Sequence, residues 1–137
     1  MPDYSSTPLI RKLGIREGMR ATFVNAPDDF SGTLGELPAD LTIVKTPRAP
    51  MDFLLFFTPR AGELAARFPK LAATLAPAGM LWIAWPKKSS GVETDITFDV
   101  VQRIGLDAGL VDVKICAIDA RWTGLKFVIR LRDRKER

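Results

Sequence analysis

Short apolar runs alternate with amphipathic stretches along the whole chain, which is the pattern of an α/β domain. Strands are predicted where the apolar runs occur, at 20–25, 41–45, 52–57, 80–85, 111–118 and 122–132. The runs 52–57 and 80–85 are apolar without alternation, as in parallel strands that are covered on both faces. We therefore place these two strands in the middle of a sheet.

Helices are predicted between the strands, at 8–13, 29–36, 59–76 and 95–108. Pro69 lies inside the third helix and is expected to kink or split it, because proline lacks an amide donor. Thr94 is placed to cap the fourth helix and Gly109 to end it. Right-handed crossovers make the first four strands parallel, and the alternation in 122–132 suits an antiparallel strand. The prediction is a three-layer Rossmann-like α/β domain with a mostly parallel six-stranded sheet in the order 2-1-3-4-6-5, the last strand antiparallel.

Three segments resemble the C-terminal half of class I methyltransferases that depend on S-adenosylmethionine (SAM). They are the stretch 75–83 (LAPAGMLWI), the helix end 108–110 (AGL) and the terminal hairpin. This resemblance implies a methyltransferase-like sheet and keeps SAM as an alternative cofactor.

A second resemblance extends over nearly the whole chain. It is carried by the segments YSSTPL (4–9), KLGI (12–15), LWIAWPKKSSGV (81–92), TD (94–95) and GLVDVKICAID (109–119). These are similar to a bacterial family of small proteins catalogued as a domain of unknown function, number three-zero-five-two. That family implies no activity, substrate or catalytic residue.

Composition narrows the chemistry. The chain has 137 residues, enough for one domain, which we place at 1–132, with a charged and disordered tail at 133–137. The absence of histidine excludes imidazole acid–base catalysis, histidine-activated nucleophiles and metal sites that need an imidazole. The single cysteine, Cys116, excludes an intrachain disulfide, and we predict no metal site. The apolar runs are too short to cross a bilayer, so we expect a cytoplasmic protein without a membrane partner.

The most distinctive polar segment follows the fourth predicted strand. It places lysines, hydroxyls and a glycine between the carboxyl end of a strand and a helix N-terminus, where free amides favour an anion. A solvated loop would have the same composition. We predict that a ligand is bound here by Lys87, Lys88, Ser89, Ser90, Gly91 and Thr94, together with Asn25 and Asp119 at the same edge of the sheet.

The chain lacks the glycine-rich loop that nucleotide and SAM sites normally carry after the first strand. It has Asn-Ala-Pro-Asp-Asp at 25–29, where proline offers no amide and two carboxylates would repel phosphate. No catalytic residue and no cofactor is identified, which favours a protein that is not an enzyme.

Three functions remain open. We favour a non-catalytic or vestigial methyltransferase-like domain that binds an anionic small molecule or a protein partner at the carboxyl ends of the strands. The alternative is a divergent SAM-dependent methyltransferase in which Asp119 and Lys88 position the acceptor. A third interpretation is a basic protein associated with nucleic acid, because the net charge is +4 and residues 130–137 hold five basic and two acidic side chains.

Overall fold

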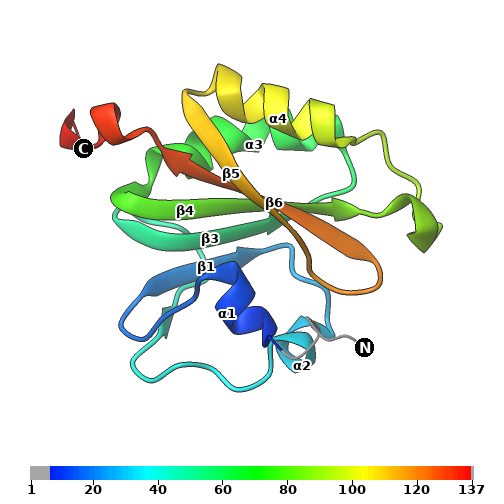
Figure 1. The fold of residues 1–137 in the computed structure, drawn as a ribbon, viewed down its shortest axis with the longest axis horizontal. Helices are drawn as coiled ribbons and strands as arrows, with labels where there is room; N and C mark the ends of the chain where they lie inside the picture. Colours follow the sequence, from blue (N-terminus) through cyan, green and yellow to red (C-terminus); the bar gives the residue numbers. More distant parts are fainter. Residues whose placement is uncertain (1–6, 137) are drawn as a thin grey trace.

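The computed structural model describes residues 7–136 as a six-stranded sheet with helices on both faces (Figure 1). Residues 1–6 of the predicted domain and residue 137 of the predicted tail lie outside the described part. In chain order the elements are α1 (Leu9–Leu13), β1 (Arg20–Val24), α2 (Phe30–Leu34), β2 (Thr42–Ile43), β3 (Met51–Phe57), α3 (Ala61–Ala73), β4 (Leu75–Pro86), the 3-10 turn η2 (Lys88–Ser90), α4 (Phe98–Asp107), β5 (Leu110–Ala117), β6 (Trp122–Ile129) and the 3-10 helix η3 (Leu131–Glu136).

The predicted topology is confirmed. The strand order is β2-β1-β3-β4-β6-β5, with the first four strands parallel and β6 antiparallel to both β4 and β5. Helices α3 and α4 cover one face, and α1 and α2 cover the other, which gives three layers (Figure 1). Strands β3 and β4 lie in the middle, as their unbroken apolar runs predicted.

Close packing holds the helices against the sheet. The indole Nε1 of Trp82, which is fully buried in β4, donates a hydrogen bond of 2.9 Å to the carbonyl of Leu13 at the end of α1. On the other face Gly105 of α4 lies over Phe127 of β6, where a Cβ would come within 2.0 Å of the ring. Any larger residue at 105 would therefore clash with the ring of Phe127, so that the ring or α4 would have to shift.

Two predicted helices differ from the observed ones. Helix α3 runs unbroken from Ala61 to Ala73 although Pro69 lies inside it. The proline is exposed, while Leu64 and Phe68 are buried against the sheet, so their burial offsets the lost hydrogen bond. Helix α4 begins at Phe98 instead of 95, because Thr94 and Asp95 form hydrogen bonds with residues at the start of α3.

Three predicted strands have different lengths. Strand β2 is reduced to two exposed residues at the edge of the sheet, where it pairs only with β1. Strand β4 begins five residues early at Leu75 and bulges opposite Met51, where Gly79 leaves room for a backbone carbonyl. Strand β6 ends at Ile129 instead of 132.

The C-terminal segment 131–136 also differs from the prediction. Residues 131–136 form 3-10 turns in η3, whereas a strand end and a disordered tail were predicted there. The Nε of Arg134 donates a hydrogen bond of 3.0 Å to the carbonyl of Ile129, which folds the segment back toward the sheet. Among residues 7–136, no helix is long and apolar enough to cross a membrane.

Candidate functional site

The loops after β1, β3 and β4 leave the sheet at one edge because these strands are parallel. The chain turns outward from β1 to β2 on one side and continues through β3 and β4 on the other, so the strand order reverses between β1 and β3. Ligands of open α/β sheets gather beyond the carboxyl ends of the strands at such a reversal. Asn25 and Lys87 both follow strands that end at this edge, as predicted.

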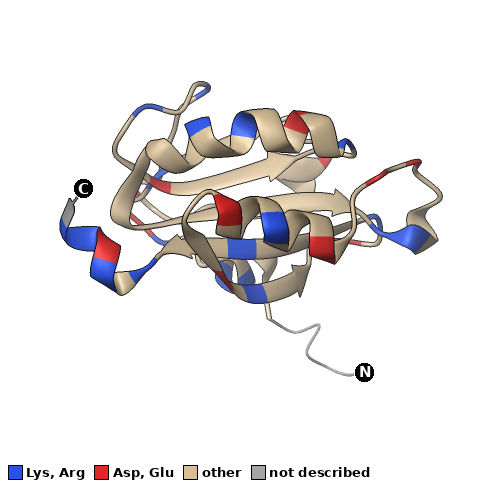
Figure 2. Ribbon diagram, turned by 90° about the horizontal axis from the view of Figure 1, so that it is seen from above, with Lys and Arg blue, Asp and Glu red and all other residues tan. Residues whose placement is uncertain are grey.

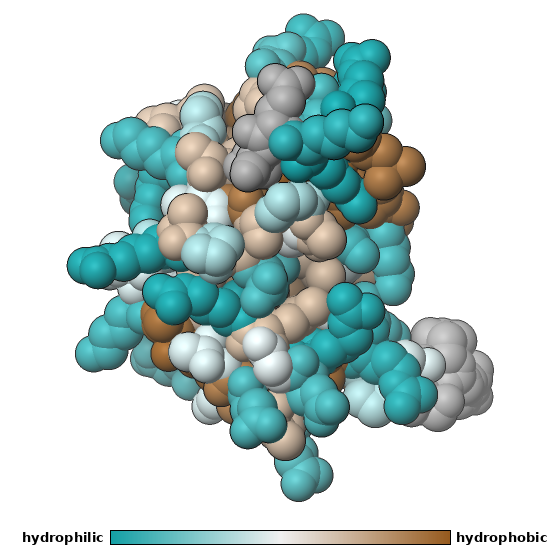
Figure 3. Space-filling view, turned by 90° about the vertical axis from the view of Figure 1, so that its left-hand side faces the viewer, coloured by the Kyte–Doolittle hydropathy of each residue, from teal (hydrophilic) through white to brown (hydrophobic). Residues whose placement is uncertain are grey.

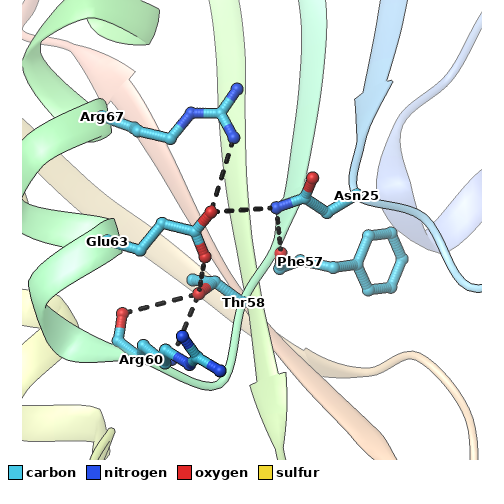
Figure 4. Close-up of polar contacts among 6 residues, drawn as sticks. All are labelled: Asn25, Phe57, Thr58, Arg60, Glu63 and Arg67. Carbon is cyan, nitrogen blue, oxygen red and sulfur yellow. Dashed lines mark hydrogen bonds and ion pairs between the residues drawn. The ribbon is translucent and has the colours of Figure 1, made fainter.

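A polar cluster centred on Glu63 occupies the reversal point (Figure 4). The hydroxyl of Thr58, which is fully buried, donates a hydrogen bond of 2.6 Å to Oε1 of Glu63. The Nδ2 of Asn25 donates to Oε2 of Glu63 and to the carbonyl of Phe57, both at 3.3 Å. The guanidinium of Arg67 lies 3.6 Å from Oε2, one helical turn away. The cluster thus joins the ends of β1 and β3 to the first turns of α3.

These contacts favour the ionised form of Glu63. The hydrogen bond from Thr58 contributes most to lowering the pKa of Glu63, burial opposes it, and Asn25 and Arg67 lower the pKa further. The result is a fixed negative charge at the reversal point at neutral pH.

Local backbone geometry explains why Asn25 and Thr58 occupy these places. Asn25 has a φ of 58°, in the left-handed region that asparagine tolerates better than most residues, and this turn ends β1. Thr58 follows the apolar strand β3, and its hydroxyl also accepts the amide hydrogen of Arg60 at 3.1 Å. Glu63 was not among the predicted site residues. A hydroxyl directly after a buried strand and an acid in the first turn of the next helix are the sequence signal that could have found it.

An apolar pocket of about 270 Å³ lies between the end of β1, α2 and β2. The rings of Phe23 and Phe30 meet edge to face in its wall at 5.4 Å between centroids. Ile43 and Leu37 expose nearly half of their surface at its rim, and Asp28 is the acidic residue among its lining side chains. This pocket is not predictable from the sequence, because its apolar residues are scattered over three segments.

The prediction that Thr94 caps the fourth helix is wrong. Its hydroxyl donates to the carbonyl of Pro59 at 2.6 Å, and the neighbouring Asp95 accepts the amide hydrogen of Ala61 at 2.7 Å. These two hydrogen bonds hold loop 91–97 against the start of α3, so α4 begins only at Phe98. The hydroxyl of Thr97 caps α4 instead, by accepting from the amide of Val100 at 3.3 Å.

Lys87, Lys88 and Thr94 line a shared groove of about 440 Å³. The other predicted site residues, Asn25, Ser89, Ser90, Gly91 and Asp119, do not line it. The Ser90 hydroxyl donates to the carbonyl of Lys87 at 2.6 Å, so it shapes the turn. Acidic side chains lie in the same loop, and Figure 2 shows red segments close to the blue turn η2. The groove itself has mixed charge, because Asp99 lines it together with Lys87 and Lys88.

Asp119 shapes the turn between β5 and β6. Its Oδ1 accepts the amide hydrogens of Arg121 at 2.8 Å and Trp122 at 2.9 Å. The guanidinium of Arg121 reaches across the edge to Asp29 at 2.8 Å and ties this turn to the loop after β1. The structure thus gives Asp119 the common structural role of an aspartate in a turn.

Within residues 7–136, no group of three side chains with metal-binding atoms is placed to hold a metal ion. Cys116 is buried, and burial raises the pKa of its thiol above the ordinary value. A neutral thiol is a poor nucleophile, so Cys116 has no evident chemical role.

Comparisons with known proteins show the fold. The chain is similar to the magnesium protoporphyrin IX methyltransferase of Synechocystis PCC 6803 with bound S-adenosylhomocysteine (SAH), with a TM-score of 0.61, 12% identity, and 88% of this chain and 78% of that chain covered. It is also similar to a SAM-dependent methyltransferase of Aquifex aeolicus, with a TM-score of 0.59, 15% identity, and 87% and 86% covered. A third similar structure is fibrillarin of Aeropyrum pernix with natively bound SAM, with a TM-score of 0.55, 15% identity, and 89% and 69% covered.

These likenesses establish the class I methyltransferase-like, Rossmann-like fold. No family model matches the chain, and no curated protein sequence matches it, so the resemblance to the domain of unknown function stays a prediction. The interpretation as a vestigial, non-catalytic domain is corrected, because many of the similar structures are SAM-dependent methyltransferases.

Proposed function

We propose that the chain is a divergent SAM-dependent methyltransferase that binds SAM at the carboxyl ends of β1 and β3. The observation that carries the proposal is the sheet order β2-β1-β3-β4-β6-β5, in a fold similar to structures crystallised with SAM or SAH. The polar cluster lies at the reversal point of this sheet, where such a cofactor is expected, and the apolar pocket lies between the end of β1, α2 and β2.

The charge of the edge supports SAM over a nucleotide. SAM has no phosphate, and its sulfonium, ammonium and carboxylate give it a net positive charge at neutral pH. The carboxylate of Asp28, which would repel a phosphate, suits a cation instead, whereas Asp29 is already paired with Arg121. The chain also lacks the glycine-rich loop that SAM sites normally carry, so SAM would have to be held here by side chains instead of by that loop. Glu63, ionised between β1 and β3, is the group that we assign to the ammonium of SAM.

The apolar pocket suits the adenosine part of the cofactor. Small-molecule sites are mostly apolar, with a few polar groups that fix orientation. Here the rings of Phe23 and Phe30 and the side chain of Pro27 would contact the base, and the carboxylate of Asp28 would accept hydrogen bonds from the ribose. A volume of about 270 Å³ is enough for a buried base with an exposed sugar.

When bound, SAM supplies a methyl group on a positively charged sulfur. The protein would bind and orient the cofactor through Glu63 and Asp28 and hold the acceptor in line with the methyl group. Because the chain has no histidine, no imidazole can remove a proton from the acceptor. This favours an acceptor that is nucleophilic in its resting state. Lys88, in the groove after β4, stays the candidate for positioning an acceptor.

Isothermal titration of the purified protein with SAM and with SAH tests the proposal. We expect a dissociation constant between about 1 µM and 1 mM, the range in which enzymes commonly bind their substrates. Heats that are absent for both ligands, together with an unchanged melting temperature at millimolar SAM, would contradict it.

Two variants locate the site. Ser31→Trp fills the apolar pocket from the exposed face of α2, and Glu63→Gln removes the fixed charge. Each is expected to raise the dissociation constant of SAM about tenfold or more. Glu93→Gln removes the same charge from an exposed part of the loop before α4 and is the matched control, expected to change the constant less than twofold. SAM binding that is unchanged in Ser31→Trp would place the cofactor elsewhere.

A further inference from the structure

A large groove lies at the end of the sheet opposite the candidate functional site, near the amino ends of the parallel strands β1 and β4. Its volume is about 860 Å³, three times that of the pocket beside β1. It lies between α1 with the loop that follows it, the start of β4, the end of β6 and η3. Figure 3 views this edge, where tan and white surface lies between teal side chains.

The groove is basic. Four cationic side chains line it, Arg11, Arg16, Lys126 and Arg134, against one acidic side chain, Glu17. None of the four forms an ion pair with a carboxylate in the part of the chain that the structure describes. The groove therefore carries an excess of positive charge within a concave surface.

The positive charges are also close to one another. Lys126 of β6 pairs in register with Lys114 of β5, and like charges on paired strands are destabilising. Lys126 is partly buried, and its burial, with Lys114 and Arg16 nearby, lowers the pKa of its ammonium below the ordinary value. An anion bound between Arg16 and Lys126 would relieve both the repulsion and the loss of solvation.

The floor of the groove is apolar and aliphatic. It is formed by Ile10, Ile15, Pro38, Ala78, Met80 and Val128. The lining includes no aromatic side chain, so the groove offers no surface on which bases of a single-stranded nucleic acid could stack. Its size is within the range of small-molecule sites.

We propose that this groove binds an organic anion that combines a phosphate or carboxylate head with an aliphatic body. Arg16 and Lys126 hold the head, and Met80, Val128 and the residues of α1 contact the body. This site lies at the edge opposite the SAM site and does not depend on the proposed methyltransferase activity.

Isothermal titration with three matched probes tests the proposal: octyl phosphate below its micelle concentration, inorganic phosphate and octanol. Octyl phosphate combines head and body, while the other two each carry one part. We expect octyl phosphate to bind at least tenfold more tightly than either of the others. Equal binding of octanol, or no binding of octyl phosphate, would overturn the proposal.

Charge-matched variants locate the site. Arg16→Gln/Lys126→Gln removes two charges inside the groove, and Lys87→Gln/Lys88→Gln removes two at the opposite edge. The first pair is expected to raise the dissociation constant of octyl phosphate at least tenfold and the second less than twofold. Lys126→Arg keeps the charge and should keep the binding, which excludes a mere folding defect. Equal losses in both double variants would overturn the assignment.

A short polyuridine RNA provides the competing outcome. RNA binding that falls steeply with salt and is lost in Arg16→Gln/Lys126→Gln, without binding of octyl phosphate, would make the groove a nucleic-acid surface and overturn the proposal. A SAM titration of Arg16→Gln/Lys126→Gln keeps the two proposals separate, because we expect the SAM affinity of this variant to equal that of the wild type.

Discussion

The two ends of the parallel strands, the carboxyl edge and the amino edge of the sheet, differ in whether their basic side chains form ion pairs. At the carboxyl edge Arg67 lies 3.6 Å from Glu63, and Arg121 lies 2.8 Å from Asp29. At the amino edge Arg16 and Lys126 line a groove and pair with no carboxylate of the described residues. The net charge of +4 is therefore a poor guide to ligands, and we propose SAM for the carboxyl edge and an anion for the amino edge. Substitutions at the two edges should then change the free energy of unfolding in opposite directions.

The largest effect is expected at the carboxyl edge, from Thr58→Val. The substitution keeps the shape of the side chain but leaves Oε1 of Glu63 and the amide of Arg60 without their shared partner. Losing a buried hydrogen bond to a charged group lowers the free energy of unfolding by about 2 kcal/mol. Urea denaturation measures this loss.

Thr42→Val is the matched control for this prediction, because Thr42 is exposed in the edge strand β2. It should change the free energy of unfolding by less than about 0.5 kcal/mol. If the two variants were equally stable, the cluster around Glu63 would not hold β3 and α3 together, and its proposed role as a preformed site would weaken.

The second prediction concerns the amino edge and has the opposite sign. Lys126→Met removes a partly buried charge opposite Lys114 and adds an apolar side chain to an apolar floor. We expect the free energy of unfolding to rise by about 0.5 to 1 kcal/mol at low salt. Salt screens the repulsion in the wild type, so the gain should shrink as ionic strength rises.

Lys88→Met tests whether this gain is specific to the amino edge. Lys88 is exposed and lies in a loop that also carries Glu93 and Asp95, so its loss should leave stability nearly unchanged. A destabilised Lys126→Met variant would mean that Lys126 has a compensating partner, and the groove would lose its excess charge.

Most of the fold could be predicted from the sequence because its signals are local. The unbroken apolar runs in β3 and β4 indicate buried parallel strands, and the alternation in β6 indicates a strand with one polar side. Strand order then follows from the handedness of crossovers. Boundaries were less predictable where a distant contact decides them, as when Asp95 binds the start of α3 and α4 begins at Phe98 instead of 95.

The candidate site was less predictable than the fold. Lys87, Lys88 and Ser90 stand out in the sequence because they are adjacent, yet the Ser90 hydroxyl serves its own turn. The cluster at the reversal point joins Asn25 to Glu63, which are 38 residues apart. The sequence signal for Thr58 and Glu63 is local, but composition and spacing carry no signal for the contact of Glu63 with Asn25, which requires the ends of β1 and β3 to be aligned.

The smallest effect is expected from Arg121→Gln at the carboxyl edge. This ion pair joins the turn after β5 to the loop after β1, but its two side chains are 51% and 62% exposed. Exposed pairs contribute little, so the free energy of unfolding should fall by about 0.5 kcal/mol or less, and 1 M salt should reduce the difference further. Arg103→Gln, an exposed arginine of α4 outside the ion pairs of the described residues, is the control. A loss well above 1 kcal/mol in Arg121→Gln would mean that the two loops move as one unit, and the carboxyl edge would then be held together by its surface charges as much as by the Glu63 cluster.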